Sequence, residues 1–397
     1  MGSVPLTLDH VECEGRRAFV RVDFNVPLDG GRVTDDTRIK AALPTLRALL
    51  EKGASVVVAS HLGRPGGEEK EDLRMAPVAE KLRELLGGMA EVVVAQDVAG
   101  RDSRSKAEAL QPGQVLLLEN LRFETGETDN DPTFAAALAG LADLFVQDAF
   151  GSCHRAHAST AALPGLLKPA VAGRLLEKEI SAFASVFDSP APPVVAVVGG
   201  AKVSDKIQVL ESLLEKVDRL LIGGGMAYTF LASRGKPTGN SLVEEDHLET
   251  ARVVTSKAEE SGVEILLPCD HVAADRFAAD ADTREVEDVP DGWMGLDIGP
   301  ATRAFYSEAL ADAGTVVWNG PMGVFEMEAF RGGTAAVARA LADSDAVSVV
   351  GGGDSVAAVK GEGLEDRIHH LSTGGGAFLA MLEGRKLPGI AALDTTS

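Results

Sequence analysis

The chain has 397 residues and only three cysteines, Cys13, Cys153 and Cys269. Because their number is odd and they lie far apart, the sequence predicts neither a disulfide framework nor a zinc site. No apolar run reaches the roughly 20 residues that a membrane span needs. Residues 1–12 lack the pattern of a secretory signal. These absences predict a protein of a reducing cytoplasm that does not cross a membrane.

Positive charge is also scarce, because 38 lysines and arginines face 60 aspartates and glutamates, which gives a net charge of −22. So negative a chain argues against nucleic acid or an anionic membrane as a partner. It suits a cell with a salty interior, where the Debye length shortens to about 3 Å at 1 M salt. We therefore hypothesise that the protein is adapted to high salt.

Several catalytic signatures are missing from the sequence as well. No stretch matches the Walker pattern of a P-loop, and none matches the dinucleotide fingerprint, which argues against a dehydrogenase. We find no Ser/His/Asp arrangement and no context that would activate a cysteine. Phosphoryl transfer is compatible with all of these absences, because it depends mainly on positioning and positive charge.

Apolar, β-branched runs recur at regular intervals and alternate with amphipathic stretches of helical periodicity. The strand candidates are 18–26, 54–60, 91–95, 115–119 and 144–148, then 194–198, 219–223, 264–268, 315–319 and 346–351. The helix candidates are 39–52, 76–86, 134–142, 207–217, 246–261 and 334–343. Strands that alternate with helices predict an α/β fold with parallel, doubly wound sheets.

Ten strands divide better between two domains than within a single sheet. We therefore predict two Rossmann-like domains, at 1–172 and 191–373. A helical pattern over 173–187 ends in a proline-rich stretch, which predicts a connecting helix and linker at 173–190. The C-terminal segment 374–397 is expected to pack back on the first domain.

In the first half, cationic and polar residues follow the strand candidates. They are Asp23 and Asn25, which we expect on one side of strand 18–26, then Arg38, His61, Arg64, Arg122, His154, Arg155 and His157. A single arginine after a strand is usually a surface ion-pair partner, and a single histidine is usually structural. Because parallel strands end at one edge of a sheet, we expect these residues to converge. Gathered guanidinium groups repel one another unless an anion joins them, so they predict a small, highly anionic ligand.

In the second half, glycine turns take the place of these cations. Residues 193–210 combine a buried strand, a turn at Gly199 and Gly200, and a helix for which Ser204 and Asp205 are suitable first residues. Lys202 and Lys206 would then lie beside a helix N-terminus, where α/β sheets bind anions.

The stretch Gly351-Gly-Gly-Asp-Ser355 also lies between a strand and a helix, so its backbone N–H groups could bind phosphate. Asp354 could hold Mg²⁺ between phosphates; the alternative is that it caps the helix. Two anion sites of different kinds predict transfer of a group between two phosphorylated molecules.

The motifs together resemble those of the phosphoglycerate kinase family, in the same order along nearly the whole chain. They are RVDFNVP at 21–27, HLGRP at 61–65, ENLRF at 119–123, HRAH at 154–157, GAKVSDK at 200–206, WNGPMGVFE at 318–326, GGGDS at 351–355 and STGGG at 372–376. The resemblance implies reversible transfer of the acyl phosphate of 1,3-bisphosphoglycerate to MgADP, which gives 3-phosphoglycerate and MgATP. It also implies a hinge between the domains and closure of the cleft.

The resemblance also implies a role for each matching residue. Phosphoglycerate would be bound by Asp23, Asn25, Arg38, His61, Arg64, Arg122 and Arg155. ATP or ADP would be bound by Lys202, Lys206, Gly223, Gly224, Gly225, Gly295, Asn319, Glu326, Gly352, Gly353, Asp354 and Ser355, with Glu326 on the ribose and Asp354 on Mg²⁺. The transferring phosphoryl group would be stabilised by Arg38, Lys202, Gly352 and Gly353.

We expect a cytoplasmic enzyme that acts as a monomer on small molecules. The alternative is a nucleotide-binding protein of the same fold that has lost catalysis, against which Arg38, Lys202 and Asp354 argue. The sequence departs from the family in a shorter loop at 156–171 and in Ser355, where threonine is common. Cys153 also lies beside the predicted cluster, and we interpret it as a buried packing residue.

Overall fold

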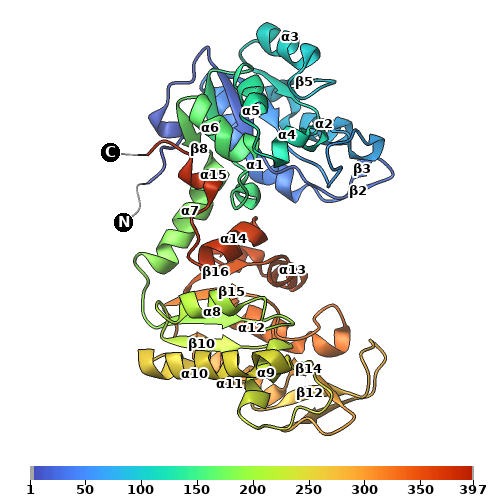
Figure 1. Ribbon diagram of the computed structural model, residues 1–397, viewed down its shortest axis with the longest axis vertical. Helices are drawn as coiled ribbons and strands as arrows, with labels where there is room; N and C mark the ends of the chain where they lie inside the picture. The colour runs from blue at the N-terminus through green and yellow to red at the C-terminus, as the bar shows by residue number, and fades with distance from the viewer. Residues whose placement is uncertain (1–3, 396–397) are drawn as a thin grey trace. The chain divides into compact units, whose positions relative to one another are not determined.

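The computed structural model describes residues 4–395 and divides them into two compact units (Figure 1). The first unit holds the chain up to Ile180 together with the segment from Lys386 onward. The second unit runs from Ser181 to Arg385. Each unit is built around its own six-stranded sheet.

The sheet of the first unit is parallel throughout, with the strand order β5-β6-β4-β1-β7-β8. In that order the strands are Glu91–Val94, Gln114–Leu117, Ser55–Ala59, Arg17–Arg21, Leu144–Gln147 and Ala170–Ala172. The apolar strand runs are buried on both faces of the sheet, as parallel strands require. Val20, Val58 and Val146 face one large core with α1 and α2, whereas Phe19 stacks on Phe145.

The helices of the first unit connect these strands. They are α1 (Thr37–Glu51), α2 (Ala76–Leu86), α3 (Arg101–Ala109), α4 (Thr125–Thr128), α5 (Pro132–Ala139), α6 (Leu163–Leu166) and α15 (Pro388–Ala391). A short hairpin, β2 (Leu28–Asp29) with β3 (Arg32–Val33), precedes α1. The predicted helix 76–86 has the observed bounds of α2, and the predicted helix 39–52 matches α1 to within two residues.

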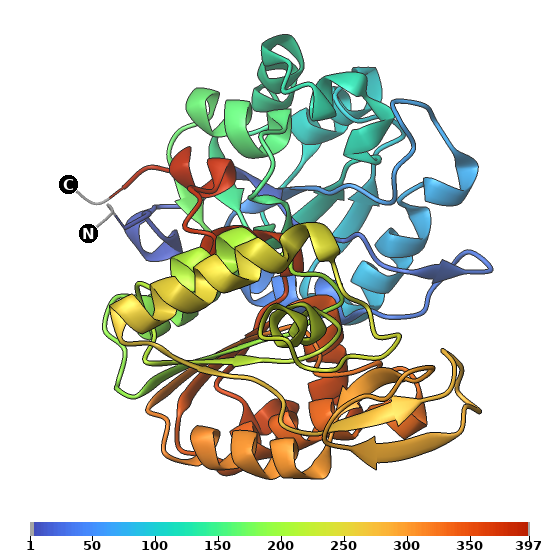
Figure 2. The same cartoon turned by 60° about the horizontal axis from the view of Figure 1, so that its bottom comes forward.

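The sheet of the second unit is also parallel, with the order β11-β10-β9-β15-β16-β17. In that order the strands are Glu264–Leu266, Arg219–Ile222, Val194–Val198, Thr315–Asn319, Val347–Gly351 and His370–Leu371. The helices are α8 (Ile207–Leu213), α9 (Met226–Ser233), α10 (Leu248–Ser261), α11 (Pro300–Ala311), α12 (Gly332–Asp343), α13 (Gly353–Gly361) and α14 (Gly375–Leu382). Figure 2 shows helices on both faces of this sheet, which makes it doubly wound.

A small antiparallel sheet in the second unit was not predicted. Its order is β13 (Thr283–Val286), β12 (His271–Ala274) and β14 (Met294–Ile298). β13 is exposed over most of its length, so it lacks the continuous apolar run by which the parallel strands were found.

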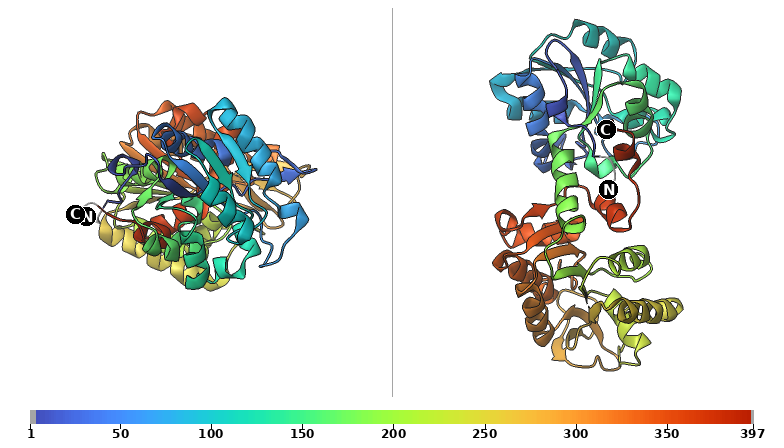
Figure 3. Two further views of the ribbon diagram at one scale, coloured as in Figure 1. Left: turned by 90° about the horizontal axis from the view of Figure 1, so that it is seen from above. Right: turned by 90° about the vertical axis from the view of Figure 1, so that its left-hand side faces the viewer.

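The connecting segment is a single helix, α7 (Arg174–Phe187), which Figure 3 shows without a break. The unit boundary falls inside this helix, between Ile180 and Ser181. The segment that returns to the first unit begins at Lys386, later than the predicted residue 374, because α14 packs on α8 and β16 of the second unit. α15 lies in the first unit, where Gly389 donates its N–H to the carbonyl of Cys153.

Two local predictions are wrong. Strand 18–26 ends at Arg21, and residues 22–27 form an extended loop. The predicted helix 207–217 begins at Ile207 as expected, in α8, but Ser204 and Asp205 are not its first residues. The N-cap residue is Lys206, and the Ser204 backbone N–H and hydroxyl both bind the carboxylate of Glu244. Among residues 4–395, no helix is both long and apolar enough to cross a membrane.

Candidate active site

In both sheets the strand order reverses beside a central strand, which is where α/β sheets bind ligands. In the first unit β1 lies between β4 and β7, and in the second β9 lies between β10 and β15. The loops after these strands carry most of the predicted site residues. We describe the two sheet edges separately.

At the first edge, the loop after β1 is held by side chains of the predicted site. The Asp23 carboxylate accepts a hydrogen bond from Arg38 at 3.0 Å and another from the Asn25 N–H at 3.2 Å. The Asn25 side-chain oxygen accepts the N–H of Gly63 at 2.8 Å, which ties this loop to the loop after β4. Asp23, Asn25 and Arg38 therefore lie together, although Asp23 and Asn25 are not on a strand.

The predicted histidine and arginines converge on the same edge. His61 is buried, and its pKa lies well below the usual value because of burial and the charges of Arg21, Arg122, Arg38 and Arg155. The imidazole is therefore neutral at pH 7. Burial and the charges of Arg155 and Arg21 also lower the pKa of Arg122 to about 10.

The loops after β4 and β6 are held together by backbone and amide groups. Arg122 donates to the carbonyl of Gly63 at 2.7 Å. Asn120 accepts the N–H of Leu62 and donates to its carbonyl. These bonds hold a buried arginine among like charges, an arrangement that an anionic ligand would stabilise.

A buried network beneath the cluster was missed by the sequence analysis. Arg21 is fully buried, and its guanidinium bonds to the Ser159 hydroxyl and lies 3.3 Å from Nδ1 of His61. Glu127, also fully buried, accepts the Ser159 hydroxyl and lies 3.8 Å from both Arg21 and His157. The only sequence feature that could have indicated a role for Arg21 was its charge within an apolar strand. No feature of the sequence indicated a role for Glu127.

Arg64 differs from the other predicted residues of this edge. It is exposed, and no hydrogen bond or ion pair holds its guanidinium within the described chain. Arg155 lies in the cluster and donates from Nε to Nε2 of His154 at 3.1 Å. Cys153 is buried and donates to the carbonyl of Ala149, and burial raises the pKa of its thiol. This agrees with the interpretation of Cys153 as a packing residue.

At the second edge, glycine turns replace side chains. The turns after β9, β10 and β15 pack backbone against backbone: the Gly200 N–H donates to Pro321 and the Gly224 N–H to Met322. A Cβ at Gly199 would lie 2.0 Å from the carbonyl oxygen of Pro321. Glycine is required here because any side chain would separate the turns.

Two adjoining cavities open at these turns, and both are lined by Gly200, Pro321 and Asp354. The larger, of 510 Å³, is mostly apolar in its lining and includes the predicted residues Gly224, Gly225, Gly295 and Glu326. The smaller, of 350 Å³, includes the predicted residues Lys206, Asn319, Gly352, Gly353 and Ser355. Gly223 lines neither cavity; it packs against Met322, where a Cβ would lie 2.4 Å from the sulfur.

The smaller cavity lies at the N-termini of two helices. α13 begins at Gly353 after Gly352, whose φ of 97° favours glycine. α14 begins at Gly375, and both Gly375 and Gly376 line the cavity, although the sequence analysis gave them no role. The first N–H groups of a helix have no partner within it, so two such ends favour a phosphate group.

The two lysines of this edge have different surroundings. Lys206 is the N-cap residue of α8, and its ammonium binds the side-chain oxygen of Asn319. Burial lowers its pKa. Asn319 in turn donates to the carbonyl of Gly351 at 2.9 Å. Lys202 is exposed and lines neither cavity.

Ser355 and Asp354 follow Gly353 in α13 and do different things. Ser355 is fully buried, and its hydroxyl accepts the N–H of Gly320 at 2.7 Å, so it fixes the turn after β15. Asp354 is exposed at the mouth of both cavities and accepts no cap bond. Within residues 4–395 no three His, Cys, Asp or Glu side chains are grouped as metal ligands.

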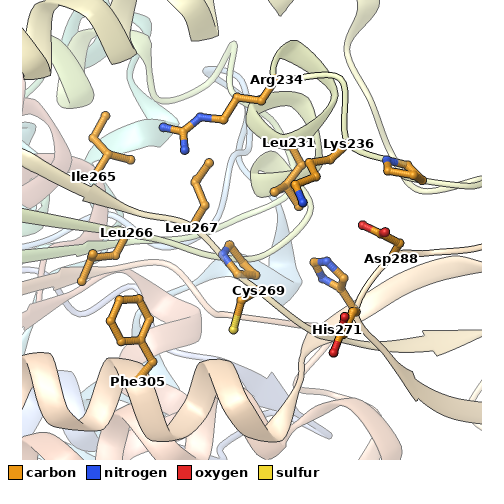
Figure 4. A pocket seen from close by; sticks show the side chains of 13 residues that line it. Leu231, Arg234, Lys236, Ile265, Leu266, Leu267, Cys269, His271, Asp288 and Phe305 are labelled. Atoms are coloured by element: carbon orange, nitrogen blue, oxygen red, sulfur yellow. The ribbon is translucent and has the colours of Figure 1, made fainter.

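A third cavity of 360 Å³ opens beside β11 and is shown in Figure 4. Leu231, Leu267, Cys269, His271 and Phe305 are among its lining residues. His271 is bonded to the hydroxyl of Tyr228. That hydroxyl lies 1.8 Å from where Gly295 would carry a Cβ, so Tyr228 stands between this cavity and the larger one. None of the predicted site residues lines it.

One sheet edge with converging guanidinium groups and another with helix N-termini around cavities define an α/β phosphotransferase. A sequence profile of the phosphoglycerate kinase family matches residues 8–385. The chain belongs to the phosphoglycerate kinase family and is an enzyme of that activity. The family and the fold class predicted from the motifs are confirmed, and nothing supports the inactive alternative.

Relatives and solved structures match almost end to end. Phosphoglycerate kinase from Herpetosiphon aurantiacus is 56% identical over 391 residues, which is 98% of each chain. That from Trichodesmium erythraeum is 53% identical over the same share. The structure of the enzyme from Coxiella burnetii superposes with a TM-score of 0.90 at 43% identity, covering 98% of each chain. For that from Pyrococcus horikoshii the TM-score is 0.83 at 35% identity, again over 98% of each chain.

Proposed function

We propose that the chain transfers the acyl phosphate of 1,3-bisphosphoglycerate to MgADP, reversibly, with the phosphoglycerate on the first unit and the nucleotide on the second. The observation that carries this assignment is the contrast between the two edges. One gathers Arg38, Arg122 and Arg155 around His61, and the other surrounds two cavities with glycine turns.

The first edge suits a small ligand of several negative charges. Arg122 and Arg155 repel each other in the free protein, and a phosphate or carboxylate between them would remove that repulsion. Neutral His61 and Asn25 supply hydrogen bonds without further charge. Arg64 would join the ligand from its exposed position, and Asp23 would orient Arg38 through their ion pair.

The second edge suits a nucleotide in an extended pose. The 510 Å³ cavity would hold the base between Gly224, Gly225 and Gly295, with Glu326 on the ribose. The phosphates would lie in the 350 Å³ cavity, on Lys206 and the free N–H groups of α13 and α14. Gly223 lines neither cavity and would support the turn after β10 rather than contact the nucleotide. Ser355 would hold the turn after β15, and Asn319 would hold Lys206 in place.

Mg²⁺ fits this arrangement through Asp354. The ion prefers one or two carboxylates, with phosphate oxygens and waters for the rest of its shell. Asp354 is an exposed carboxylate at the border of the two cavities, and no other acidic residue lines either of them except Glu326. When bound, the ion would neutralise charge on the phosphates.

The chemistry requires no general base, because in the direction of ATP consumption the attacking carboxylate is already ionised. The barrier comes from bringing two anions together. Arg38 and Lys202 would offset this repulsion as charge moves to the transferring group, assisted by the N–H groups of Gly352 and Gly353. Because the group passes directly between the substrates, water must be kept away from it during the transfer.

A coupled assay for ATP formation from 1,3-bisphosphoglycerate and MgADP tests this function. We expect turnover that is lost when EDTA removes the divalent metal and restored when Mg²⁺ is added. Nucleotide binding without any ATP formation would contradict the proposal. We further propose a cytoplasmic monomer; light scattering after size exclusion should give the 41.4 kDa of one chain.

A further inference from the structure

The start of α7 is capped in an unusual way. This helix runs from Arg174 in the first unit to Phe187 in the second, across the boundary after Ile180. The residue before it is Gly173, which has no side chain with which to cap. The first N–H groups of a helix need acceptors from outside the helix when they are buried.

The acceptors come from two distant segments of the first unit. The hydroxyl oxygen of Thr45 accepts the N–H of Arg174 at 2.8 Å. One carboxylate oxygen of Asp148 accepts the N–H of Leu175 at 3.0 Å and that of Leu176 at 3.3 Å. Thr45 and Asp148 are buried, so water does not compete for these bonds.

Gly173 makes this approach possible. A Cβ at this position would lie 2.2 Å from the bonded oxygen of Asp148 and 2.9 Å from the Thr45 methyl group. Any side chain here would push the carboxylate away from the helix. The ordinary arrangement, a serine or aspartate at the N-cap itself, is therefore excluded.

The two capping residues belong to elements that carry the proposed phosphoglycerate site. Thr45 lies in α1, two turns after Arg38. Asp148 directly follows β7 and opens the loop that carries Arg155. Its backbone N–H donates to the carbonyl of Arg21 at 2.8 Å. The cap thus joins α1, β1 and the loop after β7 to the first turn of α7.

This cap is costly to the folded protein. The second oxygen of Asp148 is buried and has no hydrogen-bond partner, and burial raises the pKa of this carboxyl to about 7. A buried, half-satisfied carboxylate destabilises a fold. A carboxylate at this position is therefore better explained by a role in function than by a contribution to stability.

Building on the proposed function, we propose that Asp148, with Thr45, is a positioning residue for the reaction. The pair fixes the direction of α7 relative to α1 and the Arg155 loop. A ligand that moves these elements thereby moves the connecting helix, which passes the movement to the second unit. Asp148 touches no substrate in this scheme.

The test compares Asp148→Ala and Asp148→Asn with a matched control, Asp131→Ala. Asp131 caps α5 of the same unit through the N–H of Phe134 at 2.8 Å and has no bond to α7. For each protein we would measure kcat, both KM values, binding of 3-phosphoglycerate by calorimetry, and the radius of gyration by X-ray scattering with and without both substrates.

We expect Asp148→Ala to lower kcat about tenfold, within the range of positioning effects. Both KM values and the affinity for 3-phosphoglycerate should stay within about twofold of the wild type, and compaction on adding both substrates should be lost. Asp148→Asn keeps an acceptor oxygen and should restore kcat and compaction. Asp131→Ala should lower the melting temperature but leave kcat and compaction unchanged.

An Asp148→Ala variant that loses stability but keeps its kcat and compaction would overturn the inference. Loss of 3-phosphoglycerate affinity in Asp148→Ala would also overturn it, because Asp148 would then act directly on the arginine residues of the phosphoglycerate site. If Asp148→Ala does not fold, Thr45→Val takes its place, with Thr45→Ser as the rescue; an unchanged kcat in Thr45→Val would be equally contrary. A wild-type enzyme without kinase activity would instead overturn the proposed function.

Discussion

The two sheet edges are alike in topology and opposite in the groups they present. The first edge presents side chains: Arg122 is buried among other cations, and its pKa falls to about 10 because of burial and the charges of Arg155 and Arg21. The second edge relies more on backbone: among the described residues Lys206 is the only cationic side chain that lines either of its two cavities, and glycine turns with two helix N-termini supply most of the lining of the smaller one.

The difference shows two solutions to anion binding. Guanidinium forks give directional contacts but repel one another until the ligand arrives. Backbone dipoles are fixed by the fold and need no counter-charge, but they require glycine wherever the ligand or another turn comes close. Activity should therefore fall most when side chains are removed from the first edge, and when side chains are added to the glycines of the second edge.

The largest effect should follow from Arg38→Ala at the first edge. Loss of one donor to the transition state lowers kcat by about 10²- to 10³-fold, and ADP affinity should be nearly unchanged. Steady-state kinetics and calorimetry with ADP measure both. Arg32→Ala, which removes an exposed arginine of the β2–β3 hairpin, is the control. Near-normal turnover in Arg38→Ala would refute its role.

Lys202→Ala tests whether the second edge also depends on a side chain. Although Lys202 is exposed in the free protein, we expect kcat to fall about 10²-fold, because its ammonium would follow the transferring group. A rise in the nucleotide KM alone would show that Lys202 binds the ground state only, and the assignment of its role would be wrong.

Gly352→Ala is the converse change, which adds a side chain. A residue other than glycine at a φ of 97° is strained by about 1–3 kcal/mol, and the new Cβ would lie 3.0 Å from the Asn319 side chain. We expect the nucleotide KM to rise about tenfold. Gly361→Ala, at the other end of α13 with no atom within 4 Å of the new Cβ, is the control. Equal KM values in both variants would contradict this prediction.

Asp297→Asn should change how stability depends on pH. Burial raises the pKa of Asp297 to about 7 from an ordinary value of 3.8, so the folded state holds a proton that the unfolded state has lost. This contribution to stability is full below pH 3.8 and is lost as the pH rises to about 7. The melting temperature should therefore fall less between pH 5 and pH 8 in the variant, by about 4 °C. If the melting temperatures of the wild type and the variant change equally between pH 5 and pH 8, this prediction is contradicted.

The smallest expected effect is that of salt, which acts on both edges through the net charge of −22. If the protein is adapted to high salt, the melting temperature should rise by a few degrees between 0.1 and about 2 M KCl, as screening reduces repulsion among surface carboxylates. Equal melting temperatures at the two KCl concentrations would count against adaptation to high salt.

The regular elements were predicted well where burial was continuous. β9 and β15 have their predicted bounds because both are β-branched and buried on both faces. The antiparallel strand β13 was missed because most of its residues are exposed. The start of helix 207–217 was predicted correctly, but Ser204 does not begin it, because its hydroxyl binds Glu244, 40 residues away, instead of the first turn of α8.

The sequence by itself determined the family, the alternation of strand and helix, and the identity of the residues at each sheet edge, because motifs and periodicity are local properties of the chain. Only the tertiary structure decided which of those residues meet. It shows that Arg64 and Lys202 are exposed, whereas Arg122 is bonded to Gly63 and Lys206 to Asn319. It also revealed Arg21, Glu127 and the cap that Asp148 provides for α7. These depend on contacts between residues far apart in sequence, and burial and pKa arise only from such contacts.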